Sequence, residues 1–429
     1  MKKSAWKLTA AACFALCFIL IYLWSTKSGA PAENRPQEEK REEEQIVLHF
    51  LHYQGEAEEA YNKVFDAYEK LHPEVRIESE FLNTENYDRV LAARIAICEE
   101  MDIVGTHPGA KQVVPLAQAG YLEDLSGADC LSGISEGSLQ SAAVGDGIYG
   151  VPTDLSYICV FYNQEIFEKY GLAVPETWTE FLQTCEAIKK EGMVPLSLGY
   201  RDIWIQQMIP YALAPTTIYR DHPDFDSAMY RGEKQFQGEE WQGTLEKMES
   251  LMELGYVTPD YLKTSYDQQI SMFAQGDAAM MVMGSWGVAL VKNLNPGLRF
   301  GLFVMPASDD GVNWISSSVG GMLSVSADSK NKEEALEFLD FLLEYDEIYA
   351  LFLEETGNLS ARMDFSYNCD PLLQELTQDI QGSYSFLDVN WPVGMGDAFI
   401  KGVEEIAMGK EIPEVCAYLD LQWREKCGE

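Results

Sequence analysis

A strand–helix–strand pattern over residues 46–81 constrains the fold of this chain more than any other feature. Residues 46–51 (IVLHFL) form a mostly apolar run, interrupted only by His49, which is typical of a buried strand. Apolar side chains then recur at helical spacing as far as Leu71, and His72-Pro73 ends the helix. Residues 75–81 alternate between apolar and polar side chains, as a second strand does. Strands joined through a helix lie parallel with a right-handed crossover, so the chain begins as an α/β fold.

The same alternation continues beyond residue 81 and predicts further elements. We expect helices over residues 86–99, 163–170, 332–343 and 395–407, and another whose capping box begins at Thr177. We expect strands over residues 101–104, 147–152, 157–162, 195–198, 278–283, 300–304 and 320–325.

The order of these elements predicts two lobes joined by a hinge. The chain changes from one set of strands to another near Asp154, near Pro306 and near Gly357-Asn358-Leu359. Three crossings build two lobes that are each discontinuous in sequence, with a cleft between them. We therefore predict a first lobe of residues 46–154 and 307–358, and a second lobe of residues 155–306 and 359–429.

The charge and the cysteines exclude several classes of function. The chain has 31 Lys and Arg against 69 Asp and Glu, a formal net charge of −38, so nucleic acid and anionic lipid head groups are poor partners. Two of its nine cysteines, Cys13 and Cys17, lie in the N-terminal apolar run. The other seven are scattered, with no CxxC spacing and no nearby histidine, which predicts neither a zinc site nor a disulfide scaffold. No Ser-His-Asp order, metal-spaced histidine pair or phosphate-binding glycine loop is present either. We therefore predict no cofactor and no metal.

The N-terminus has the pattern of a targeting segment. Lys2, Lys3 and Lys7 precede an apolar run over residues 8–24, which fits a secretory signal or a signal anchor within residues 1–30. Residues 31–45 are charged and lack large apolar side chains, as a flexible acidic tether does. We favour an uncleaved anchor, with cleavage and secretion as the alternative. Either way, we expect the folded part outside the cytoplasmic membrane.

The stretch over residues 273–286 (FAQGDAAMMVMGSW) is a candidate for ligand contact. A strand over residues 278–283 runs into Gly284-Ser285-Trp286, which turns the chain into another helix. Glycine lets the backbone approach a ligand, Ser285 offers a hydroxyl, and Trp286 offers a broad aromatic face. That combination suits an uncharged, polyhydroxylated ligand such as a sugar. The alternative is a tryptophan buried in the core, and this stretch alone does not separate the two.

Several segments, in this order along the chain, resemble the family 1 extracellular solute-binding proteins of ABC importers, the maltose-binding-protein-like group. They are GEAEEAYNKVFDAYEKLHPEVRIE (55–78), LAQAGYLEDLS (116–126), IYGVPTDLSYICVFYNQEIFEKYGL (148–172), VPETWTEF (174–181), FAQGDAAMMVMGSW (273–286) and GGMLSVSADSKNKEEALEFLDFL (320–342). The resemblance covers nearly all of residues 46–424. It implies a two-lobed, periplasmic-binding-protein-like (type II) α/β clamshell with discontinuous lobes and a three-crossing hinge.

The resemblance also implies a function. The chain would capture a sugar or oligosaccharide as a monomer, without enzyme activity, and deliver it to ABC permease subunits in the membrane. An extracellular glycosidase is one alternative, but it needs two carboxyl groups about 5 Å or roughly 6.5–9.5 Å apart, and only Asp154 is placed in the cleft by these motifs. A clamshell that senses its ligand for a signalling system remains open. So does a binder of cations or polyamines, which the net charge of −38 suggests.

Loops at the cleft-facing ends of strands hold the ligand in proteins of this family. By that resemblance and the strand positions, the predicted ligand-binding residues are His52, Tyr53, Thr106, His107, Asp154, Tyr157, Trp204, Ser285, Trp286, Arg362 and Trp391. Trp391 is expected to stack on the sugar beside Trp286. Alternatives stay open at three positions: Tyr53 as a cap on the core, Asp154 as a turn former, and Arg362 as the partner of a surface acid.

Overall fold

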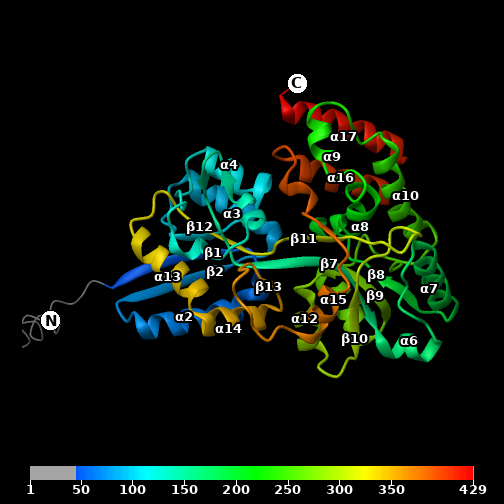
Figure 1. Ribbon diagram of the computed structural model, residues 1–429, viewed down its shortest axis with the longest axis horizontal. Helices are drawn as coiled ribbons and strands as arrows, with labels where there is room; N and C mark the ends of the chain where they lie inside the picture. Colours follow the sequence, from blue (N-terminus) through cyan, green and yellow to red (C-terminus); the bar gives the residue numbers. More distant parts are fainter. Residues whose placement is uncertain (1–44, 429) are drawn as a thin grey trace, which may run out of the picture. The chain divides into compact units, whose positions relative to one another are not determined.

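The computed structural model describes residues 45–428 of the 429-residue chain. The predicted anchor over residues 1–30 and residues 31–44 of the predicted tether lie outside the described residues. Within the described part, none of the helices is both long and apolar enough to cross a bilayer. Residues 45–428 form an α/β structure with two large sheets, each covered by helices (Figure 1).

The first sheet confirms the α/β start of the chain. Its strand order is β2-β1-β3-β12-β6, and β1 pairs in parallel with both β2 and β3. Strand β12 returns from much later in the sequence and pairs antiparallel with β3 and β6. The strands are β1 (Ile46–His52), β2 (Val75–Phe81), β3 (Ile103–Gly105), β6 (Val151–Pro152) and β12 (Met322–Val325).

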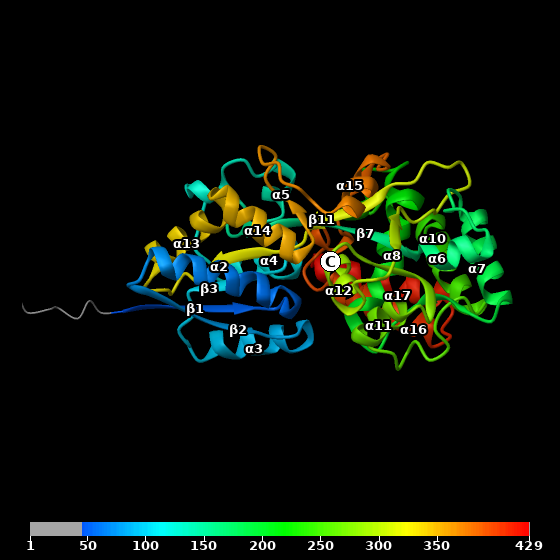
Figure 2. The ribbon, with the colours of Figure 1, turned by 90° about the horizontal axis from the view of Figure 1, so that it is seen from below.

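Helices cover both faces of the first sheet because the side chains of β1 alternate. Leu48 and Phe50 lie in one core cluster, whereas Leu51 lies in another. Figure 2 shows α2, α13 and α14 on one side of the sheet and α3 on the other. The elements are η1 (Gly55–Ala57), α2 (Glu58–Leu71), α3 (Thr84–Ala96), η2 (Gly109–Lys111), α4 (Val113–Gln118), η3 (Asp129–Leu131), α5 (Glu136–Gln140), α13 (Lys332–Glu344) and α14 (Asp346–Thr356), with a ribbon of β4 (Ala143–Val144) and β5 (Gly147–Ile148).

The second sheet is built on one long strand, β7 (Asp154–Asn163). The first residues of β7 pair with β13 and β11, and its later residues pair with β9 and β10. Strand β8 pairs with β9, and β14 pairs with β11. The remaining strands are β8 (Val194–Ser197), β9 (Ala278–Gly284), β10 (Phe300–Phe303), β11 (Ile315–Val319), β13 (Leu359–Ser360) and β14 (Ser383–Tyr384).

A local sequence signal marks the start of one helix in the second lobe. The capping box predicted at Thr177 is present, with Glu180 N donating to Thr177 Oγ1 at 3.2 Å. The elements are α6 (Gln164–Tyr170), α7 (Trp178–Lys190), η4 (Ile203–Gln207), α8 (Met208–Ala214), η5 (Pro215–Tyr219), α9 (Phe225–Tyr230), α10 (Glu239–Glu253), α11 (Tyr266–Gln275), α12 (Gly287–Leu294), α15 (Pro371–Gln378), η6 (Leu387–Val389), α16 (Met395–Ala407) and α17 (Ile412–Cys427).

Three crossings connect the two sheets and meet at one place. The first passes through Thr153, between β6 and β7, and the third through Gly357 and Asn358, between α14 and β13. The second joins β11 to β12 and is bonded to the first, because Thr153 N donates to Gly321 O at 2.9 Å. Strand β13 pairs with the first residues of β7, so the third crossing lies there too. These bonds make one hinge.

The second crossing lies at Gly320 and Gly321 rather than near Pro306. Residues 315–319, predicted for the first lobe, form β11 and are hydrogen-bonded into the second sheet. The lobe boundary predicted near Pro306 is therefore wrong. The loop that follows Pro306 and strand β11 both belong to the second lobe. The other lobe boundaries stay a prediction.

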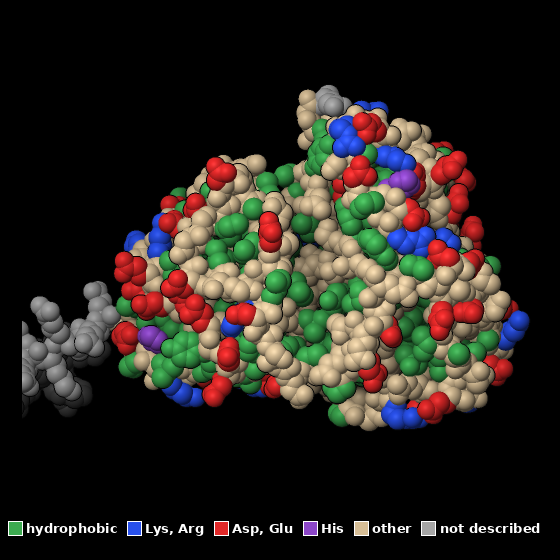
Figure 3. Space-filling view, viewed as in Figure 1, with side chains coloured by type: hydrophobic (Ala, Val, Ile, Leu, Met, Phe, Trp, Pro, Cys, Tyr) green, Lys and Arg blue, Asp and Glu red, His purple; other side chains and the backbone are tan. Residues whose placement is uncertain are grey.

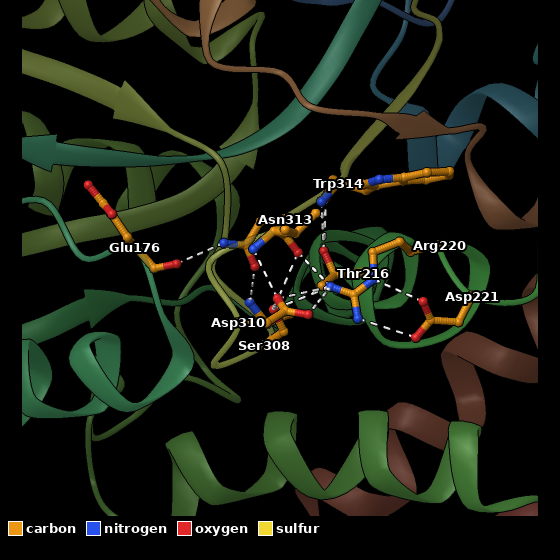
Figure 4. Close-up of polar contacts among 10 residues, drawn as sticks. Glu176, Thr216, Arg220, Asp221, Ser308, Asp310, Asn313 and Trp314 are labelled. Atoms are coloured by element: carbon orange, nitrogen blue, oxygen red, sulfur yellow. Dashed lines mark hydrogen bonds and ion pairs between the residues drawn. The ribbon is translucent and has the colours of Figure 1, made fainter.

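The loop before β11 shows why the crossing comes late. Asn313 Nδ2 donates to Glu176 O at 2.8 Å, and Trp314 N donates to Thr216 Oγ1 at 2.8 Å. Arg220 Nη1 donates to the carbonyl oxygen of Val312 at 2.7 Å. Figure 4 shows these bonds holding the loop against the start of α7 and against η5. The loop is thereby kept on the second lobe until β11 begins.

Candidate functional site

A cleft of about 930 Å³ receives side chains from both lobes. Its volume lies within the range of small-molecule sites. The first lobe contributes the loops after β1, β2 and β3, through Tyr53, Gln54, Gly55, Glu56, Phe81, Leu82, Asn83, His107, Pro108 and Lys111. The second sheet and its helices contribute Arg201, Asp202, Trp204, Gln207, Met208, Tyr211, Tyr266, Asp267, Ile270, Ser271, Trp286, Leu290, Asn293, Leu294, Phe386, Asp388 and Val389, and Val319 and Gly320 complete the lining at the hinge.

Three aromatic side chains, Trp204, Tyr266 and Trp286, form an aromatic wall on the second-lobe side of the cleft. The ring centroids of Trp204 and Tyr266 are 4.9 Å apart, and those of Trp204 and Trp286 are 6.4 Å apart. Tyr266 is the first residue of α11, and its backbone N–H donates to Asp202 Oδ2. Because all three rings are only partly buried, the wall offers apolar faces to a ligand.

The turn at Gly284-Ser285-Trp286 explains how Trp286 reaches the cleft. Ser285 is fully buried, its N–H donates to Tyr157 O at 2.8 Å, and its Oγ accepts from Tyr157 N at 3.2 Å. These bonds fix the turn to β7. A Cβ on Gly284 would overlap the Trp286 ring, so only glycine lets this ring lie against the end of β9. The structure therefore assigns the serine to the scaffold and the tryptophan to the cleft.

Several polar atoms lining the cleft lack a hydrogen bond of ordinary geometry to any described residue. They are Trp286 Nε1, Tyr266 Oη, Tyr211 Oη, Gln207 Oε1 and His107 Nε2. Of these, Tyr266 and Trp286 still interact with each other, and Tyr211 interacts with Asp388. Unpaired polar atoms withdrawn from water are costly, and they are commonly satisfied by ligand or solvent. The set combines donors and acceptors without formal charge, which matches the hydroxyl groups of a neutral polyol.

The first-lobe side of the cleft is organised around Tyr53. Its ring lies 4.0 Å from that of His107, and its hydroxyl donates to Gly320 O at 3.3 Å. Gln54 Nε2 donates to the same carbonyl at 3.1 Å. His52 is fully buried behind Tyr53, and burial lowers the pKa of His52 to about 3. Burial also holds the pKa of His107 well below its usual range, so both imidazoles are neutral at physiological pH.

The charged residues of the cleft disfavour an anionic ligand. Four carboxylates (Glu56, Asp202, Asp267 and Asp388) stand against Lys111 and Arg201. Desolvation raises the pKa of Glu56, and the nearby charge of Asp267 raises it further. Figure 3 shows Asp and Glu side chains toward both ends of the visible face, with Lys and Arg sparser. The field of the cleft thus favours a neutral or cationic ligand.

Two predicted site residues lie away from the cleft. Trp391 is 2% exposed and packs in the core of the second lobe, where its Nε1 donates to Asp226 Oδ1 at 3.3 Å. Arg362 pairs with Asp346 and Asp364, and its Nη1 donates to Leu343 O at 2.6 Å. The prediction of ligand stacking by Trp391 is wrong because that ring packs among the rings of Phe236, Trp241, Phe399 and Trp423. For Arg362, the alternative of a bridge to surface acids is the one that the structure shows.

The other predicted residues divide between the cleft and its support. Tyr53, His107, Trp204 and Trp286 line the cleft, as expected. The remaining five (His52, Thr106, Asp154, Tyr157 and Ser285) are not among the lining residues. Thr106 is bonded to Ser324 Oγ at 2.8 Å, and Asp154 is buried in the hinge, where its Oδ2 accepts from Thr153 Oγ1 at 3.0 Å. These side chains hold the loops that carry the cleft residues.

Sequence reasoning missed Gln54, Gln207, Tyr211 and Tyr266. Three of them lie on helical turns of the second lobe rather than on loops at strand ends. Only Tyr266 carried a local signal, because the capping box at Ser265 and Gln268 marks it as the first residue of a helix. A helix start offers free backbone N–H groups, so the start of α11 is a position at which a ligand contact can form.

Comparison with known sequences decides the family. Residues 54–347 match the family of bacterial extracellular solute-binding proteins. The chain belongs to this family. The "Multiple sugar-binding protein" of Streptococcus mutans is 22% identical over 320 residues, covering 72% of this chain and 74% of that protein. The melibiose/raffinose/stachyose-binding protein MelE of Bacillus subtilis is 23% identical over 366 residues, covering 81% of this solute-binding protein and 82% of MelE.

A solved structure shares the fold of this solute-binding protein. RafE in complex with raffinose aligns with a TM-score of 0.76 at 22% identity, covering 89% of this chain and 100% of RafE. The two-lobed α/β fold and the family predicted from the sequence are confirmed. These relatives are sugar-binding proteins rather than enzymes.

Proposed function

We propose that this solute-binding protein captures an uncharged sugar or oligosaccharide in the inter-lobe cleft and delivers it to the permease of an ABC importer. The observation that carries the proposal is the aromatic wall of Trp204, Tyr266 and Trp286, together with the unpaired polar atoms beside it. A sugar ring presents C–H faces to aromatic side chains and hydroxyls to donors and acceptors, so one ligand satisfies both features.

The relatives support the same proposal. MelE is named for melibiose, raffinose and stachyose, and RafE was solved with raffinose. The family is an extracellular one, which agrees with a targeting segment at the N-terminus. We propose further that residues 1–30 anchor the protein to the membrane, that residues 31–45 are the tether, that the protein is a monomer, and that the bound sugar is released unchanged.

The first test is a binding screen with the purified folded part. We expect a series of neutral sugars, including melibiose, raffinose, stachyose and maltodextrins, to contain at least one ligand that raises the melting temperature and binds in calorimetry. We expect Trp286→Ala to weaken binding of that ligand by about fivefold or more, because stacking contributes on the order of 1 kcal/mol beyond the buried area. Failure of every neutral sugar to bind would refute the proposal, and hydrolysis of a bound glycoside would replace it with a glycosidase.

A second prediction concerns the glycine that accommodates Trp286. Gly284→Ala should displace the indole ring and weaken sugar binding by about tenfold, at a stability cost of about 1–3 kcal/mol from overpacking. Calorimetry and chemical denaturation measure the two effects separately. Gly243→Ala on α10 is the matched control, because a Cβ there meets no atom within 4 Å. Unchanged affinity in Gly284→Ala would show that the position of the Trp286 ring is irrelevant to the ligand.

A further inference from the structure

Residues 383–389 form a segment of the second lobe that borders the cleft, and we call this segment the strap. It consists of β14 and η6, with two residues between them. Phe386, Asp388 and Val389 of the strap line the cleft. The strap lies between α15 and α16 in the chain and is not one of the three crossings, so the hinge does not set its position.

The strap is fixed to the second lobe along its length. Strand β14 pairs in parallel with β11, and Tyr384 Oη donates to Asp226 Oδ2 at 3.0 Å. Leu387 is fully buried in the core of the second lobe. The Asp388 carboxylate interacts with the Tyr211 hydroxyl of α8. With these bonds and this burial, the strap moves together with the second lobe rather than as a free loop.

The last residue of the strap touches the first lobe. A Cβ on Gly109, in η2, would lie 2.4 Å from the carbonyl oxygen of Val389 and 3.0 Å from Val389 Cγ1. Only glycine lets the two backbones approach so closely, and the φ of Gly109, +63°, also favours glycine. Gly109 N donates to Ser141 O at 2.7 Å, which ties η2 to the first lobe. Elements η2 and η6 thus form a contact between the lobes that is separate from the hinge.

This contact affects how a ligand leaves the cleft. Opening the cleft on this side separates η2 from η6, so the contact stabilises the arrangement in which the lobes meet. Its loss shifts the population toward an open arrangement. A ligand held between the lobes dissociates from the open arrangement, so its dissociation rate constant rises with that population.

We propose that the strap closes one side of the cleft against η2 and thereby slows the release of bound sugar. This inference rests on the proposed function, because a sugar is the ligand that the strap retains. The hinge joins the lobes through the chain itself, whereas η2 and η6 join them through the packing of two turns. Gly109 is a positioning residue, because it is not among the residues that line the cleft and acts through Val389.

The sharpest test adds one methyl group to η2. Gly109→Ala places a Cβ against Val389 O and should raise the dissociation rate constant of the sugar by about fivefold to tenfold. Stopped-flow tryptophan fluorescence measures this rate with the tightest binder among melibiose, raffinose, stachyose and maltodextrins. Gly120→Ala is the matched control, because Gly120 also lies in the first lobe with a positive φ of +79°, but a Cβ there meets no atom within 4 Å. It introduces similar backbone strain and should leave the rate unchanged.

Small-angle X-ray scattering tests the contact without any sugar. We expect Gly109→Ala to have a larger radius of gyration than the parent protein, because the added Cβ pushes η2 away from η6. Gly120→Ala should have the radius of gyration of the parent protein.

A second variant acts from the side of the strap. Tyr384→Phe removes the hydroxyl that donates to Asp226, so the strap is held less firmly and the dissociation rate constant should rise by about twofold to fivefold. Tyr261→Phe is its matched control, since the Tyr261 hydroxyl donates to Ala407 O at 3.0 Å and this residue does not line the cleft. This control should release the sugar at the rate of the parent protein.

The strap and the proposed function fail in different ways. If a sugar binds and Gly109→Ala releases it at the parent rate, or if Gly120→Ala releases it equally fast, the strap is refuted and sugar binding stands. If no sugar binds, the proposed function fails, and an unchanged radius of gyration in Gly109→Ala would refute the strap as well. If Gly109→Ala does not fold, an unchanged rate in Tyr384→Phe refutes the strap.

Discussion

Replacing Asp154 with asparagine is expected to raise the free energy of unfolding by up to about 4 kcal/mol at pH 8. Asp154 is 1% exposed, and its Oδ1 has no hydrogen-bond partner among the described residues. Burial raises the pKa of this carboxyl from 3.8 to about 7, although hydrogen bonds from Thr153 and Gly321 oppose the shift. The difference of about 3 pH units corresponds to about 4 kcal/mol at 1.36 kcal/mol per unit.

The sign of the pH dependence follows from whether the folded or the unfolded protein binds the proton of the Asp154 carboxyl more tightly. A carboxyl whose pKa is higher in the folded state favours folding while it is protonated. That contribution is fully present below pH 3.8 and is lost as the pH rises toward 7. Asparagine is neutral throughout. The stability gap between Asp154→Asn and the parent protein should therefore be near zero at pH 4 and largest above pH 7.

Urea denaturation at pH 4, 6 and 8 measures this gap directly. Asp66→Asn is the matched control for the exchange of an acid for its amide, because Asp66 is exposed on α2. Other buried acids titrate equally in all three proteins, so the comparison isolates Asp154. A constant gap across this range, or a loss of stability in Asp154→Asn at pH 8, would contradict the assignment of an uncompensated buried carboxylate at the hinge.

Trp391→Ala is expected to lower the free energy of unfolding by about 3–5 kcal/mol, the range for truncating a large core aromatic. The Trp391 ring lies 5.2 Å from that of Phe399 and 5.9 Å from that of Trp241. Its indole also donates to Asp226, whose carboxylate accepts from Tyr219 at 2.7 Å as well. Truncation therefore leaves a cavity and removes one donor from a buried carboxylate.

Trp286→Ala is the companion variant, with the opposite expected pattern. Trp286 is only partly buried and lines the cleft, so its loss should reduce sugar affinity and change stability little. Trp391→Ala should keep its sugar affinity at temperatures where it remains folded. Denaturation and calorimetry on both proteins separate the two roles. A strong loss of affinity in folded Trp391→Ala would place this residue at the ligand after all.

Structural features that depend on residues close together in the sequence were predictable. The parallel pair β1 and β2, the capping box at Thr177, the turn at Gly284-Ser285-Trp286 and the span of α16 all appear where the sequence placed them. Each depends on periodicity or on bonds between residues a few positions apart. Such interactions are encoded locally, and the surrounding structure reinforces them.

The cleft depended more on contacts between distant segments. Trp286 and Trp391 are both late tryptophans, but only tertiary packing, which surrounds Trp391 with other aromatic rings, places one in the core and leaves the other at the cleft. Tyr211 carries no feature that separates it from other helix residues, and the capping box marks Tyr266 only as a helix start. Both become cleft residues through the position of their helices. The second crossing likewise moved to Gly320 because Asn313 and Trp314 bond to residues far away in sequence.

The sequence by itself thus determined the α/β start of the chain, the spans of several helices, the family and the chemistry of the turn that carries Trp286. The strand predicted over residues 147–152 is wrong, since these residues form the two short strands β5 and β6. The tertiary structure decided which aromatic rings share the aromatic wall, where the chain crosses at the hinge, and which polar atoms are left unpaired. The physical reason is that helix and strand formation follow local periodicity, whereas burial and hydrogen-bond satisfaction depend on which distant segments pack together.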